Sequence, residues 1–267
     1  MALVAALASL TINFGLIDLI DGYTGYVDQA RNQVLDAGWG LVFGVILPLG
    51  LLAQLHRPER RIAGLQQTAL VAFAVAVAGA AGEAWGYLAL AAGIAGACAL
   101  LVLLHPARRT FLAQGERRDA LMLALAGVAA VPALVYARRM ASAQRRDLPP
   151  DDAVTNGLHH WTVMTALALI VVLLMALAGL RTAGCRIPAL SASIAAGGWA
   201  ISCLLAPESA AGSEGHAWAW AVIVWAAMTL AATLSPRRRL FASAANPTEL
   251  VTGDAAGAWS EHAPSIE

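Results

Sequence analysis

The chain has 267 residues, of which 59% are hydrophobic and only 13% are charged, and its formal net charge at pH 7 is zero. A soluble domain usually carries about 25% charged residues, so a chain this poor in charge is expected to be solvated mainly by lipid. The zero net charge excludes a general attraction to nucleic acid, and the absence of lysine excludes a retinal Schiff base.

Eight apolar segments follow one another along the chain, each close to the roughly 20 residues that a helix needs to cross a bilayer. Helix is the expected structure because backbone groups in lipid must be satisfied within the segment, and the alternation typical of barrel strands is missing. The sequence therefore predicts an all-α, polytopic integral membrane helix bundle within residues 1–240. In chain order, the expected spans are 3–20, 39–55, 65–81, 85–104, 119–137, 158–180, 188–206 and 216–234.

Two of these spans need comment. The first lacks the basic start and small-residue cleavage site of a signal peptide, so we expect it to be retained as a helix. Pro132 is expected to kink the fifth. The polar residues 241–267, which follow the last span, are expected to form a disordered cytoplasmic tail.

Tryptophan and arginine mark opposite ends of the even-numbered spans, which open on Trp39, Trp85, Trp161 and Trp218. If these spans run from outside to inside, twelve arginines lie on the inner side and five on the outer side. The positive-inside rule then predicts that both termini are cytoplasmic. Exclusive use of arginine, with abundant alanine and glycine, is typical of a GC-rich bacterial genome, so the expected location is a bacterial plasma membrane.

The even-numbered spans also share an order of residues: an acid or histidine, then tryptophan, an apolar helix, and a basic end. This order predicts four two-helix repeats, near 1–64, 65–115, 116–186 and 187–240. The alternative is that any helix running inward acquires an interfacial tryptophan and a basic inner end.

Glu83, His160 and His216 lie at similar depth at the predicted outer ends of even-numbered spans. If those helices adjoin, the three side chains could hold zinc or another divalent transition metal, and the imidazoles could instead bind haem iron. The alternative is that they are solvated residues at helix starts, where the helix dipole favours a carboxylate.

Asp18 and Asn13 are the polar groups of the first span that could face a substrate pathway. Asp18 lies about one turn from the predicted outer surface and is a candidate ion-coupling group. Asn13 shares a helix face with Ser9, and the simpler expectation is a hydrogen bond to another helix. Spans three to eight carry no charge near mid-membrane, which weighs against a transporter.

No GxSxG, HExxH or P-loop pattern occurs, so an enzyme is not expected. The expected function is that of a non-enzymatic scaffold or accessory protein, which contacts the lipid bilayer and other membrane proteins and needs no cofactor. One alternative is a small permease or exporter with a site between helix repeats. The second alternative is a membrane protein that binds a metal or haem at the outer histidine and acid cluster.

Overall fold

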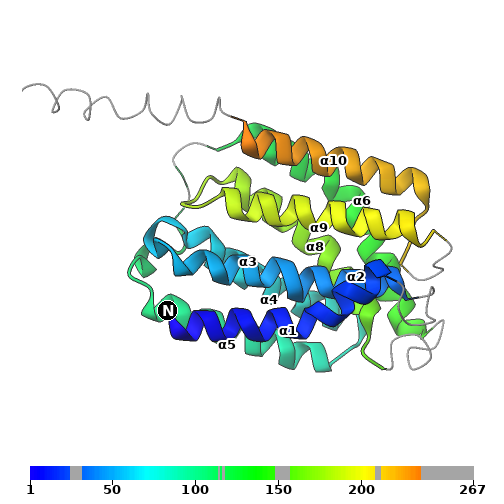
Figure 1. The fold of residues 1–267 in the computed structure, drawn as a ribbon, viewed down its shortest axis with the longest axis horizontal. Coiled ribbons are helices and arrows are strands. Elements are labelled where there is room, and N and C mark those ends of the chain that lie inside the picture. The colour runs from blue at the N-terminus through cyan, green and yellow to red at the C-terminus, as the bar shows by residue number, and fades with distance from the viewer. Residues whose placement is uncertain (25–31, 114, 116–117, 148–156, 208–211, 236–267) are drawn as a thin grey trace, which may run out of the picture. The chain divides into compact units, whose positions relative to one another are not determined.

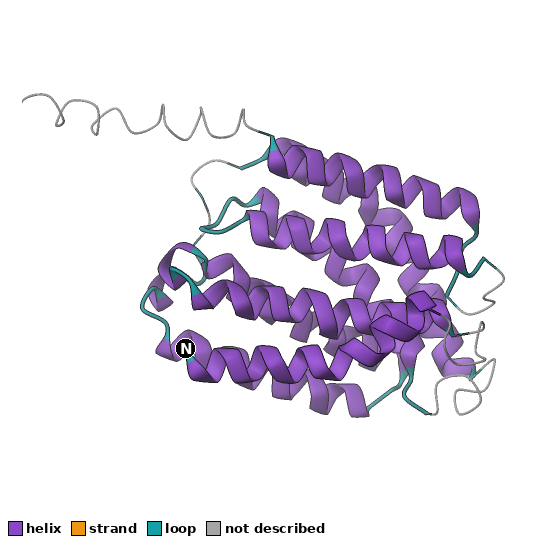
Figure 2. Cartoon of the chain, in the orientation of Figure 1, coloured by secondary structure: helices purple, strands orange, loops and turns teal. Residues whose placement is uncertain are grey.

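The computed structural model describes residues 1–24, 32–113, 115, 118–147, 157–207 and 212–235. Within these residues the chain is all-α, and eight helices are long and apolar enough to cross a membrane (Figure 1, Figure 2). Seven are continuous: α1 (Ala2–Thr24), α4 (Ile62–Gly82), α5 (Gly86–Leu104), α6 (Ala120–Arg146), α8 (His160–Gly179), α9 (Arg186–Leu205) and α10 (His216–Leu234). The predicted all-α bundle is confirmed.

The remaining span, second in chain order, covers Gln33–Leu55 and is composite. It consists of α2 (Gln33–Gly40), the π-helix η1 (Leu41–Ile46), α3 (Leu47–Leu52) and the 3₁₀ turn η2 (Ala53–Leu55). Two further 3₁₀ turns, η3 (Pro58–Arg60) and η4 (Arg108–Thr110), follow the second and fourth spans.

Some helix ends differ from the predicted ones. The second span begins at Gln33 instead of residue 39, which brings Asp36 into its first turn. α6 continues to Arg146 instead of ending at residue 137, and it contains Pro132. The tail expected over residues 241–267 lies outside the described residues.

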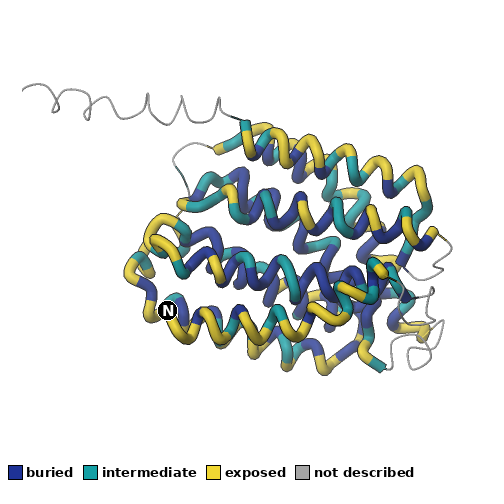
Figure 3. The backbone as a smooth tube through the Cα atoms, viewed as in Figure 1, coloured by how far each residue is buried: buried dark blue, intermediate teal, exposed yellow. Residues whose placement is uncertain are grey.

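The helices divide into an interior set and a peripheral set (Figure 3). The second span, α4, α8 and α9 are the most buried, whereas α1, α5, α6 and α10 expose large apolar side chains. Such exposed apolar faces fit a lipid environment, in which hydrocarbon replaces water around the bundle. The largest fully buried side chains of the interior set include Phe43, Leu65, Met164, Ile170 and Leu174.

Glycines let α1 pack closely on the second span. A Cβ atom on Gly15 would overlap the backbone of Gly44, and one on Gly22 would overlap the backbone of Ala37. Gly40 makes the reciprocal contact, because a Cβ there would overlap Leu19. Small residues at a helix interface allow this approach, and the approach places the last turns of α1 beside the first turns of α2.

The second span changes from α to π geometry in the segment that precedes Pro48. In η1 the Leu47 amide bonds to the Val42 carbonyl, five residues back, and Pro48 then has no amide hydrogen to donate. Gln67 from α4 bonds to the last residue of the π segment: its Nε2 donates to the Ile46 carbonyl at 2.6 Å and to Ser191 Oγ of α9 at 3.0 Å. The buried amide group of Gln67 is thus bonded both to the backbone of the irregular span and to a neighbouring helix.

Candidate metal centre

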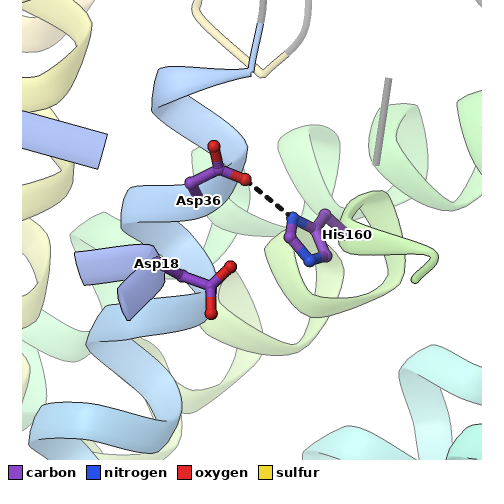
Figure 4. A group of neighbouring side chains, drawn as sticks. All are labelled: Asp18, Asp36 and His160. Atoms are coloured by element: carbon purple, nitrogen blue, oxygen red, sulfur yellow. Dashed lines mark hydrogen bonds and ion pairs between the residues drawn. The ribbon is translucent and has the colours of Figure 1, made fainter. Parts of the chain in front are cut away.

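Three ionisable side chains from three helices converge at one end of the bundle (Figure 4). They are Asp18 on α1, Asp36 on α2 and His160 on α8. His160 Nδ1 lies 3.1 Å from Asp36 Oδ1, and the Asp18 carboxylate points toward the same imidazole. One candidate ligand atom from each residue lies within 4.8 Å of the other two. Among the described residues, this is the one such group of histidine, cysteine and acid side chains.

The group is enclosed on the imidazole side and partly open on the carboxylate side. The His160 side chain is 3% exposed, and that of Asp36 is 16% exposed. His160 Nε2 is shielded and has no hydrogen-bond partner among the described residues. A shielded polar atom without a partner costs about 1–3 kcal/mol of stability.

His160 is held in place by a ring contact with its imidazole and by hydrogen bonds to the turn that precedes it. The Trp39 ring lies 4.8 Å from the imidazole, at an interplanar angle of 31°. The turn that precedes α8 is fixed by Tyr87, whose hydroxyl donates to the Leu158 carbonyl at 2.6 Å. His159 has a left-handed backbone with φ of 55°, and its side chain pairs with Gln144 at 2.9 Å. The imidazole is therefore positioned before any ligand arrives.

Among the described residues, no arginine forms an ion pair with Asp18 or Asp36. With both carboxylates ionised and the imidazole neutral, the three side chains would carry two negative charges. Two arginines of α6 are engaged elsewhere: Arg139 pairs with Glu214, and Arg145 donates to the Ala81 carbonyl. Carboxylates inside an apolar bundle are costly, and a bound cation would offset their charge.

One imidazole nitrogen and two carboxylate oxygens form a donor set that suits zinc and related divalent transition metals. Zinc bonds to such ligands measure about 2.0–2.2 Å, so the three ligand atoms would have to draw together around an ion. The two carboxylates have room for that movement because they are less buried than the imidazole. Three protein ligands leave a coordination position open to water or to a further ligand.

The chain matches no protein-family model, and no curated protein or solved structure matches it. Its function must therefore be inferred from its own residues.

The structure combines residues that the sequence had assigned to different sites. His160 was expected to meet Glu83 and His216, but it lies with Asp18, which was expected to line a substrate pathway. Glu83 is exposed at the end of α4, and His216 is exposed at the start of α10. Neither belongs to the group around His160. Asn13 is exposed on α1, and it too lies outside the group.

Asp36 is the member that sequence reasoning did not assign to a site. It precedes Trp39, the residue at which the sequence predicted that the second span opens. The available signal was the apolar pair Val34 and Leu35, which extends the helical pattern toward the N-terminus. Both side chains are fully buried in the structure.

Two apolar cavities lie away from these carboxylates. One, of about 210 Å³, lies between α6, α8, α9 and α10 and is lined in part by Trp199, Trp218 and Trp225. The other lies between α4 and α5. No described residue of α1 lines either cavity, so neither forms a passage to Asp18.

Proposed function

We propose that this chain is a multi-pass protein of a bacterial plasma membrane that binds a divalent transition-metal ion, such as Zn²⁺, at Asp18, Asp36 and His160. The observation that carries the proposal is the convergence of two carboxylates and a shielded imidazole from three helices. Ionisable side chains inside a membrane bundle are costly and commonly functional. An accessory or scaffold role gives no reason to keep three of them together, whereas metal binding does.

Both termini are proposed to lie in the cytoplasm, which puts the metal site on the outer side of the membrane. The support is the arginine distribution, with twelve on the proposed inner side and five on the outer side. Reporter fusions test this orientation: a fluorescent protein that folds only in the cytoplasm should be active after residue 235, and alkaline phosphatase should not. The reverse result would place the site on the cytoplasmic side.

Metal binding is tested on the full chain purified in mild detergent and stripped with a chelator. Equilibrium dialysis against Zn²⁺ and Mn²⁺, followed by elemental analysis, should give close to one ion per chain. Asp18→Asn, Asp36→Asn and His160→Gln should each weaken binding by at least about 100-fold, because each removes a direct ligand.

Glu83→Gln and His216→Gln are the matched controls, because both residues are exposed and lie outside the group. They should bind metal like the unmodified chain. Loss of binding in these two variants, with retention in Asp18→Asn, would instead support the cluster expected from the sequence. A chain that binds neither ion, while its helical circular dichroism remains intact, would contradict the proposal.

A second candidate function is a small permease for the same ion. Its support is the irregular second span, in which the π segment begins five residues after Asp36 and is followed by Pro48. Interrupted helices often line the binding sites of transporters. Vesicles that contain the chain and an internal zinc-sensitive dye should then show uptake that Asp18→Asn abolishes. Stoichiometric binding without uptake would favour a binding role alone.

A further inference from the structure

Asn13 places a carboxamide at the centre of a peripheral helix. Eleven positions separate it from each end of α1, Ala2 and Thr24. At 1.5 Å per residue this is about 16 Å from either end, close to the middle of a hydrocarbon core about 30 Å thick. The residue is exposed, so its surroundings in the membrane are lipid tails or another protein.

The hydrogen bonds of Asn13 stay within α1. Its Nδ2 donates to the Ser9 carbonyl at 2.8 Å and approaches Ser9 Oγ at 3.5 Å. Within the described residues, the carboxamide oxygen accepts no hydrogen bond. The bond to another helix that the sequence led us to expect is therefore not made within this chain, and an unmet amide oxygen in hydrocarbon is unfavourable.

Asn13 belongs to a stripe that faces away from the bundle. Residues spaced four, three, four, three and four apart fall on one side of an α-helix. On α1 this spacing joins exposed residues that are mainly small in the first half, and we call them the α1 outer stripe: Ala2, Ala6, Ser9, Asn13, Leu16 and Ile20. The buried residues of α1 lie on the opposite side of the helix and include Val4, Ala8, Gly15 and Gly22.

We propose that the α1 outer stripe is a homodimer interface, in which α1 of one copy packs in parallel against α1 of a second copy. A two-fold axis along the membrane normal puts the two Asn13 side chains at the same depth. Each carboxamide then donates to the other and accepts from it, because asparagine carries both functions. A different protein would need its own polar group at this depth, whereas a second copy supplies it automatically.

The small side chains support the same geometry. Ala2, Ala6 and Ser9 allow two helix backbones to approach, and close approach is what stabilises helix pairs in lipid, where the hydrophobic effect gives no driving force. Asp18 projects from the other side of α1, toward α2 and α8. The proposed interface is therefore independent of the metal site, and either proposal can fail alone.

Dimerisation is tested with the full chain in liposomes by Förster transfer between labelled copies, at increasing lipid dilution. The unmodified chain should transfer energy in a dilution-dependent manner. Asn13→Leu should weaken association by about tenfold or more, since it removes both reciprocal bonds. Asn13→Gln keeps the carboxamide and should retain most of the association. Val131→Leu, on the exposed face of α6, is the matched control and should behave like the unmodified chain.

Disulfide trapping gives a second readout that preserves Asn13. Under mild oxidation, Ser9→Cys should produce covalent dimers in the membrane, and Val131→Cys should not. Helical circular dichroism confirms that each variant is folded. A chain that remains monomeric at every dilution, or an Asn13→Leu variant that associates as well as the unmodified chain, would overturn the proposal. Trapping through residue 131 but not residue 9 would also overturn it.

Discussion

Gly15 of α1 lies directly against Gly44 of the second span, with no side chain between the two backbones. A methyl group on Gly15 would overlap the Gly44 backbone, so the helices would have to separate. We expect Gly15→Ala to lower the free energy of unfolding by about 1–3 kcal/mol, the usual cost of overpacking. It should also weaken Zn²⁺ binding, because Asp18 follows Gly15 by less than one turn. Thermal unfolding in detergent and zinc dialysis measure the two effects.

Gly93 on α5 provides the matched control for this variant. No described atom outside the local helix lies within 4 Å of a Cβ built there. Gly93→Ala should therefore leave zinc binding unchanged and should not lower stability, since alanine is the better helix former by about 0.5–1 kcal/mol. Equal behaviour of Gly15→Ala and Gly93→Ala would show that α1 and the second span do not meet as described.

Gln67 is expected to stabilise the irregular second span. Its side chain is fully buried and bonds both the Ile46 carbonyl and Ser191. Gln67→Leu has a similar size but cannot donate, so it should lower the free energy of unfolding by about 1–3 kcal/mol. Ser191→Ala removes one of the two bonds and should cost less. A Gln67→Leu variant as stable as the unmodified chain would mean that the break near Pro48 needs no support from α4.

The number and type of the helices could be predicted because lipid imposes both. A span must be long and apolar, and its backbone must be satisfied internally. Helix ends were harder to predict: the second span was expected to open at Trp39, but it begins at Gln33. Asp36 therefore lies within a helix, where it is sheltered by His160 from α8. The cost of the charge is reduced by a partner 124 positions away in sequence.

Single residues of the site could be predicted, but their meeting at one site could not. His160 and Asp18 each stood out as polar groups near the end of an apolar span. Nothing in their spacing indicates that α1, α2 and α8 adjoin, because helix order in a bundle depends on tertiary packing. Glu83 has a similar position along its own helix but lies exposed at the end of α4.

His105, at the end of the bundle away from the candidate metal centre, should make the stability of the chain depend on pH. His105 follows α5 and is buried, and its Nδ1 accepts from the Ala107 amide at 3.0 Å. Burial lowers the pKa of His105 from its ordinary 6.5, against smaller opposing effects of the Pro58 backbone and Glu59. Below about pH 6.5 the unfolded chain therefore binds more protons than the folded one, and the free energy of unfolding falls.

Melting temperatures in detergent between pH 7.5 and 5 test this expectation. The unmodified chain should lose stability as the pH falls from 6.5 toward the lowered pKa of His105. His105→Gln should show a flatter profile over that range. His56→Gln is the control, because His56 lies in the neighbouring turn but is exposed, and it should keep the slope of the unmodified chain. Identical profiles for both variants would contradict a special role for His105.

Tyr87 and Tyr136 offer a paired test of how the metal site is positioned. Each hydroxyl donates to a backbone carbonyl: Tyr87 to Leu158 at 2.6 Å, and Tyr136 to Gly212 at 2.7 Å. Removing either hydroxyl should cost a similar amount of stability, about 1 kcal/mol. The Tyr87 bond fixes the turn that presents His160, so Tyr87→Phe should also weaken Zn²⁺ binding by about fivefold. Tyr136→Phe should destabilise the chain equally and leave zinc affinity unchanged. If both variants lower the affinity alike, the effect reflects general loosening of the bundle, and Tyr87 has no specific role in positioning His160.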